Sequence, residues 1–145
     1  MTTAHEIAQN IIALSGEQLT NLKLQKLLYY AQAWNLVFTD QRLFHEDIEA
    51  WVHGPVVPAV FREFKCYQWK PIDERGVKPT DEHTASLLSE VIRVYGKFTA
   101  TQLERLTHQE PPWVEARGGL PPDAPSKNMI CTARMKSYYS SLLNG

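Results

Sequence analysis

The sequence predicts a single domain over residues 1–145 that is mainly α-helical, with a few short β-strands around a central helix at about residues 21–38. Two observations support this prediction. Apolar residues recur at helical spacing through most of the chain, and no internal repeat divides it. With 145 residues, 43% of them hydrophobic, the chain can bury roughly two-thirds of its unfolded surface in one compact core.

The first two helices are predicted from apolar periodicity. Residues 3–14, "TAHEIAQNIIAL", form the first, and Gly16 is expected to end it in a left-handed conformation. Thr20 or Asn21 is expected to cap the central helix. Two rows of apolar residues lie far apart around that helix, so we expect burial on two sides. The first row is Leu24, Leu27, Leu28, Ala31 and Phe38, and the second is Leu22, Tyr29 and Leu36.

A change of period predicts β-structure in the middle of the chain. In "RLFHEDIEAWVH" apolar residues alternate with polar ones from Ile48, which predicts a short strand. Gly54 and Pro55 are interpreted as a turn, and Pro58 as the first turn of a helix that runs towards Tyr67. A polar loop with a strand-like piece around Ile72 is expected to follow.

The C-terminal half again predicts helices. The segment "TDEHTASLLSEVIRVYGKF" predicts one that ends near Gly96. In "FTATQLERLTHQ", Thr101 and Glu104 have the spacing of a capping box and predict a further helix. Residues 111–125 contain five of the nine prolines and predict a long irregular connection. Thr132 is expected to cap the last helix.

Charge and cysteine content indicate the class of protein. Lys plus Arg (15) nearly balances Asp plus Glu (16), so the basic excess typical of nucleic-acid binders is missing. Cys66 and Cys131 are far apart and fit reduced thiols. The first ten residues have neither a basic region nor an apolar stretch, so we expect no signal peptide. No apolar run approaches the roughly 20 residues that span a bilayer, and we expect a cytoplasmic protein without a membrane partner.

The sequence offers little support for catalysis. The five histidines lack the spacing of a metal site, and no nucleophile motif is present, so we expect no metal, no cofactor and no enzymatic activity. One enzymatic alternative stays open. It requires His45, Glu49 and His53 to converge in a pocket, because only then could they act together in acid–base chemistry.

A DNA-binding regulator is the second alternative. Residues 95–109 resemble the front half of a helix-turn-helix motif, in which Gln102, Arg105 and Gln109 would face the bases. Acidic neighbours and the neutral overall charge argue against this interpretation, so we expect no nucleic-acid partner for the chain by itself.

Several long blocks are similar to a known family. "LTNLKLQKLLYYAQAW" and "LFHEDIEAWVHGPVVPAVFREFK" resemble the Panacea domain, the SocA-like antitoxin family also seen in phage-associated proteins. "YGKFTATQLERLTHQEPPW" and "ICTARMKSYYSSLL" extend the resemblance to roughly residues 4–143. It implies an antitoxin of a toxin–antitoxin pair. Such a protein neutralises a cognate protein toxin, encoded by an adjacent gene, through direct protein–protein binding.

The resemblance also points to residues. Most matching positions are expected to define the fold: Leu24, Gln25, Leu27, Leu28, Tyr29, Trp51, Gly54, Pro55 and Val56. His53 stands where many members have an aromatic residue. Two candidate partner-binding surfaces stay open. One is an outward row of the central helix with Lys23, Lys26 and Tyr30, and the other is the segment 111–125 with Trp113 and Arg117. The oligomeric state, a homodimer included, also stays open.

Overall fold

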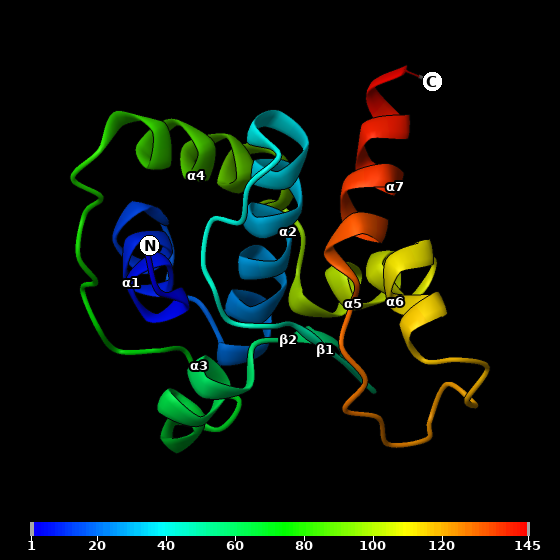
Figure 1. Cartoon of the computed structure of the whole chain (residues 1–145). Coiled ribbons are helices and arrows are strands. Elements are labelled where there is room, and N and C mark those ends of the chain that lie inside the picture. Colours follow the sequence, from blue (N-terminus) through cyan, green and yellow to red (C-terminus); the bar gives the residue numbers. More distant parts are fainter. Residues whose placement is uncertain (1, 145) are drawn as a thin grey trace.

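The computed structural model describes residues 2–144 of the chain. Within this range it is mainly helical with one small antiparallel sheet (Figure 1), which confirms the predicted fold class. The helices are α1 (Ala4–Leu14), α2 (Asn21–Thr39), α3 (Pro58–Glu63), α4 (Glu82–Tyr95), α5 (Ala100–His108), α6 (Pro111–Ala116) and α7 (Thr132–Asn144). A short 3₁₀-helix, η1 (Lys65–Tyr67), follows α3, and the strands are β1 (Glu49–Trp51) and β2 (Gly54–Val56).

Helix α2 is the element around which the others pack. It contacts α1, α3, α4, α5, α7 and β2, and Figure 1 shows it in the middle of the molecule. Thr20 caps its start, where the hydroxyl accepts a hydrogen bond from Lys23 N at 3.2 Å. Fourteen of its 19 residues are buried, which confirms the predicted burial on two sides. Each buried leucine contributes about 1.5–3 kcal/mol relative to exposure, so α2 anchors the core.

Helix α1 ends one residue earlier than the predicted stop. Thr3 caps its start by accepting from Glu6 N at 3.2 Å. At the other end the backbone becomes extended at Ser15 (φ −69°, ψ 134°). The prediction that Gly16 ends the helix in a left-handed conformation is therefore wrong, because the chain has already left the helix without such a residue.

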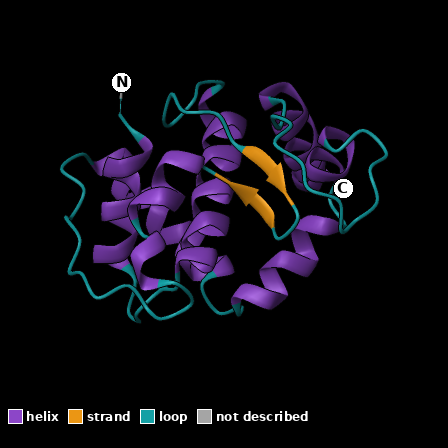
Figure 2. Cartoon of the chain, turned by 90° about the horizontal axis from the view of Figure 1, so that it is seen from below, coloured by secondary structure: helices purple, strands orange, loops and turns teal. Residues whose placement is uncertain are grey.

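The hairpin corrects another prediction. Gly54 and Pro55 belong to β2, and the turn is formed by Val52 and His53, so Ala50 lies opposite Pro55. A proline is tolerated in this pairing because Ala50 donates its N–H to the other side, to Asn128 O at 2.8 Å. The irregular segment before α7 thus runs along β1, and Figure 2 shows the two strands with helices on both sides of them.

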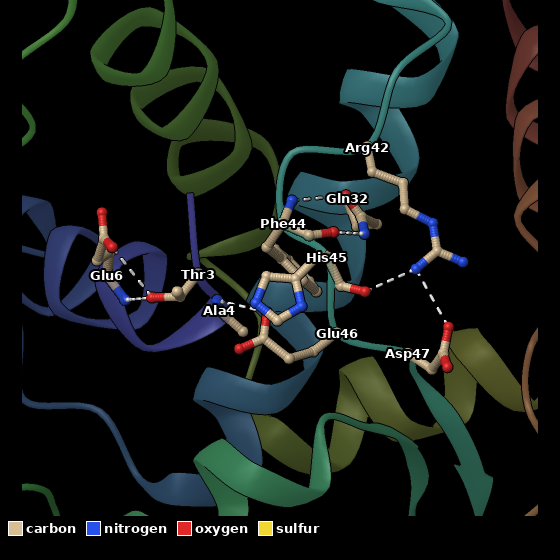
Figure 3. A network of polar contacts seen from close by, with 9 residues as sticks. All are labelled: Thr3, Ala4, Glu6, Gln32, Arg42, Phe44, His45, Glu46 and Asp47. Atoms are coloured by element: carbon tan, nitrogen blue, oxygen red, sulfur yellow. Dashed lines mark hydrogen bonds and ion pairs between the residues drawn. The ribbon is translucent and has the colours of Figure 1, made fainter. Parts of the chain in front are cut away.

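The loop between α2 and β1 is fixed by polar contacts (Figure 3). Gln32 on α2 donates to Phe44 O at 2.8 Å, and Arg42 donates to His45 O at 2.9 Å. Glu46 accepts from the N–H of Ala4, the first residue of α1, at 2.9 Å. These contacts satisfy backbone groups that would otherwise be unpaired, and they position the hairpin next to α2.

The cap of helix α5 lies two residues before the predicted one. Its cap is Thr99, whose hydroxyl accepts from Gln102 N at 3.1 Å while the Gln102 side chain accepts from Thr99 N at 2.8 Å. The predicted box of Thr101 and Glu104 is wrong in register. Both pairs have the right spacing, but Thr99 has the extended backbone (φ −73°, ψ 165°) that a cap requires.

The predicted irregular connection at residues 111–125 begins with a helix of six residues. Pro111 and Pro112 begin α6, where a missing N–H costs nothing because the first-turn donors have no partner inside the helix. The remainder, up to residue 131, is irregular as expected. Thr132 is the first residue of α7 and not its cap, because Met135 N donates to Cys131 O at 3.1 Å.

Candidate partner-binding site

All five residues predicted to bind a partner are buried. Lys26 and Tyr30 are 0% exposed, Arg117 2%, Trp113 4% and Lys23 8%. The prediction of an outward row on the central helix is therefore wrong, and Trp113 and Arg117 do not form a loop surface either. A contact between any of these side chains and a partner protein stays a prediction. What the structure does show is how these side chains and the motif around them hold the hairpin.

Gln25 and Lys26 attach α2 to β2. The Gln25 side-chain oxygen accepts from Val57 N at 2.9 Å, and Lys26 Nζ donates to Pro55 O at 3.1 Å. Burial lowers the pKa of Lys26 to about 7, and the negative charge of Glu104 opposes this shift. The blocks "KLQKLLYYAQ" and "EAWVHGPV", which are far apart in the sequence, therefore contact each other directly.

Trp113 and Arg117 attach α6 to β1. Trp113 Nε1 donates to Trp51 O at 2.9 Å, and Arg117 Nη1 donates to Ala50 O at 3.1 Å. The guanidinium also lies 4.8 Å from the centre of the Trp113 ring, which is cation–π geometry. Arg117 further holds the following turn by donating to Pro121 O at 2.8 Å. These two residues stabilise the hairpin from the side opposite α2.

A buried carboxylate joins α2, α6 and α7. Glu110 accepts from the hydroxyls of Tyr30 at 2.7 Å and Tyr139 at 2.9 Å. The Tyr139 hydroxyl also lies 2.9 Å from that of Tyr29. Burial raises the pKa of Glu110, while the two tyrosine donors act in the opposite direction. Through Tyr139 this cluster fixes the position of α7, the C-terminal helix, on α2.

The residues of the enzymatic alternative have three different partners. His45 pairs with Glu46 at 3.6 Å, His53 with Glu104 at 3.0 Å, and Glu49 accepts from Trp51 Nε1 at 2.8 Å. The structure does not bring them together in one hydrogen-bonded cluster. Within residues 2–144 no group of three or more His, Cys, Asp or Glu side chains is placed to hold a metal ion, and no helix is long and apolar enough to cross a membrane.

The helix-turn-helix-like segment forms α5, which starts after a short connection from α4. Arg105 and Gln109 are exposed, whereas Gln102 is engaged in the capping box. Glu104 on the same helix pairs with His53. DNA binding by this segment stays a prediction.

An open apolar groove lies between α2, α4 and the end of α7. It encloses about 520 Å³, and seven of its ten lining side chains are apolar or aromatic. Two of these side chains are strongly exposed, Phe38 at 62% and Leu143 at 59%. The lining residues are Trp34, Phe38, His83, Ser86, Leu87, Glu90, Val91, Val94, Tyr95 and Leu143.

The sequence interpretation missed this groove. Phe38 belongs to the first apolar row of α2, and that row was interpreted as core from end to end. The available signal was its position in the last turn of the helix. Trp34 is half-buried in the turn before and donates its indole N–H to the Tyr95 hydroxyl at 2.9 Å. The groove is our candidate partner-binding site.

Comparisons with known proteins agree with the motifs. The sequence profile of the family described as "Antitoxin SocA-like, Panacea domain" matches residues 24–114. Antitoxin SocA of Caulobacter vibrioides (strain NA1000 / CB15N) is 33% identical over 109 residues. The match covers 66% of this chain and 58% of the relative, so the chain spans somewhat over half of that protein's length. No solved structure matches the chain. From these matches, the chain belongs to the SocA-like antitoxin family, defined by the Panacea domain.

Proposed function

We propose that this protein neutralises a cognate protein toxin, encoded by an adjacent gene, by binding it directly. The observation that carries the proposal is the open apolar groove of α2, α4 and α7. Phe38 and Leu143 expose more than half of their side chains at this groove, and exposed apolar area of this kind is typical of protein interaction sites. Antitoxin family membership supports a toxin as the partner.

The shape of the groove favours an amphipathic helix of the toxin. Leu87, Val91 and Val94 on α4 follow one another at helical spacing and form one wall, with Phe38 of α2 beside them. Such a wall accepts the apolar stripe of a partner helix. Glu90 is the acidic residue in the lining, so a basic residue next to that stripe would be electrostatically complementary.

Co-expression tests the proposed function. The neighbouring open reading frame is expressed alone and together with this protein, and growth is followed. We expect the neighbour to arrest growth alone and this protein to restore it, with the two proteins co-purifying as a complex. A neighbour that is harmless alone, or that stays toxic in the presence of this protein, overturns the proposal.

Single substitutions test the groove. Phe38→Glu and Leu143→Glu place a charge at exposed positions of the groove, so the fold should be retained while binding weakens about tenfold or more. The matched control is Val77→Glu, because Val77 is 61% exposed and lies outside the groove. If both groove variants neutralise the toxin normally, the toxin binds another surface of this protein.

A further inference from the structure

We propose that the turn Tyr67–Lys70 is a second contact surface for the toxin and that Trp69 inserts into an apolar pocket with an acidic rim on that protein. This inference rests on the proposed function, since it names a second part of the same interface. It starts from one side chain. Trp69 is 82% exposed, whereas Trp34, Trp51 and Trp113 are half-buried or buried.

The turn holds Trp69 outward in an unfavourable backbone conformation. Lys70 N donates to Tyr67 O at 3.0 Å, and Gln68 has φ 57° and ψ −122°. These angles belong to the first central residue of a type II′ turn, a position that favours glycine. A non-glycine residue there costs about 1–3 kcal/mol, and strain of this kind is concentrated at functional sites.

The segment is anchored on both sides of the turn. Before it, Phe64 is 0% exposed and packs against the Tyr67 ring. After it, Ile72 is 2% exposed, and its N–H donates to Leu19 O at 2.7 Å. The Tyr67 hydroxyl also donates to Glu74 at 3.1 Å. Trp69 is therefore presented by a fixed turn, and little conformational entropy is lost when a partner binds it.

The charges around Trp69 indicate the chemistry of the partner. Arg62, Lys65 and Lys70 are exposed and form no ion pair with any residue between positions 2 and 144. Glu63 lies among them but pairs with His5 at 2.6 Å. Three unpaired cations within seven positions of an exposed tryptophan fit an apolar pocket with carboxylates at its rim.

The size of a stable interface explains why one partner would use both surfaces. The turn lies beyond α3, near the start of α2 (Figure 1). The groove is lined by Trp34 and Phe38, near the end of α2. A helix of 19 residues is about 28 Å long. A standard interface covers about 800 Å² and 20–30 residues of each protein, which exceeds the groove and reaches across roughly this length. A toxin bound in the groove can thus reach Trp69.

Purified complexes test the inference. The affinity of the neighbour's toxin is measured for the wild type, for Trp69→Ala and for the double variant Lys65→Glu/Lys70→Glu, at low and high salt. We expect each variant to weaken binding about tenfold or more and the wild-type affinity to fall with salt. Val77→Ala and Lys78→Glu are matched controls, because both residues are exposed in the following loop and should leave the affinity unchanged.

The outcomes separate this inference from the proposed function. If the wild type does not bind the toxin, the proposed function fails. If it binds and neutralises but Trp69→Ala binds equally well, the inference fails and the proposed function stands. If Trp69→Ala weakens binding but the Lys65→Glu/Lys70→Glu variant and the salt concentration have no effect, the part of the inference that gives the toxin's pocket an acidic rim is overturned. A 20-nucleotide single-stranded oligothymidine is tested as an alternative ligand. If it binds the wild type but not Trp69→Ala, and this substitution leaves toxin binding unchanged, the turn binds nucleic acid and the proposal is overturned.

Discussion

Lys26 lies directly against the backbone of Gly54. A Cβ atom at position 54 would approach Lys26 Cε to 2.6 Å and the Thr107 hydroxyl oxygen to 3.1 Å. The same glycine has φ +109°, a conformation that side chains rarely adopt. The buried ammonium on α2 and the glycine that opens β2 therefore require each other, although 27 residues separate them in the sequence.

Gly54→Ala should destabilise the protein by about 2–4 kcal/mol, because it adds both backbone strain and a clash with a buried side chain. Urea unfolding measures the change. Gly16→Ala is the control, since nothing lies within 4 Å of its Cβ position and its φ is not positive. It should change stability by less than about 1 kcal/mol. Equal stabilities of the two variants would contradict the role of Gly54.

Lys26→Met should remove a pH dependence of stability. The pKa of Lys26 falls from 10.5 when unfolded to about 7 when folded, because the ammonium is buried. Between these values the unfolded chain holds a proton that the folded chain has released, so the free energy of unfolding rises with pH by at most about 1.4 kcal/mol per pH unit.

Urea unfolding between about pH 7.5 and 9.5 should show this rise in the wild type and in Lys78→Met, an exposed control, but not in Lys26→Met. An unchanged slope in Lys26→Met would show that another group titrates.

Tyr139→Phe should lower stability by about 1–3 kcal/mol, since it removes one of the two tyrosine donors of a buried carboxylate and the contact with the Tyr29 hydroxyl. Tyr138→Phe tests whether any tyrosine on α7 has this effect, because no partner of its hydroxyl lies in residues 2–144. Thermal unfolding compares the two variants. A similar loss in both would contradict the role of the Tyr139 hydroxyl in linking α7 to Glu110.

Thr99→Ala should cost about 1 kcal/mol and Thr101→Ala less than about half of that, because only Thr99 caps α5. Chemical denaturation of the two variants decides between them. The reverse order would mean that Thr101 caps α5, as the sequence pattern predicts.

The sequence contains enough periodicity to predict most helices and the central place of α2. Prediction from the sequence fails where two neighbouring segments carry the same motif, as with the two capping-box patterns that begin at Thr99 and Thr101. It also fails where proline marks a helix start as readily as a loop, as at Pro111. In such cases the decision is made by tertiary contacts, such as the bond from Trp113 to Trp51 O that places α6 against β1.

The candidate site was harder to predict than the fold. Lys23 and Lys26 carry charge, so a surface position was expected, but each finds an oxygen partner inside the protein: Gly96 O at 2.7 Å for Lys23 and Pro55 O at 3.1 Å for Lys26. Phe38 is apolar and belongs to a predicted apolar row, so its burial was expected. Exposure depends on which elements cover a residue, and local sequence does not encode that.

Apart from the half-buried Trp51, the motif residues that carry the family resemblance lie inside the molecule. Lys26, Gln25 and Gly54 join α2 to the β1–β2 hairpin. All three are buried, so a partner protein cannot contact them. Two proteins with these motif residues would therefore share a fold without binding the same toxin. We expect toxin specificity to be exchanged between two such proteins when the groove side chains and the turn Tyr67–Lys70 are transferred from one to the other. The buried residues need not change.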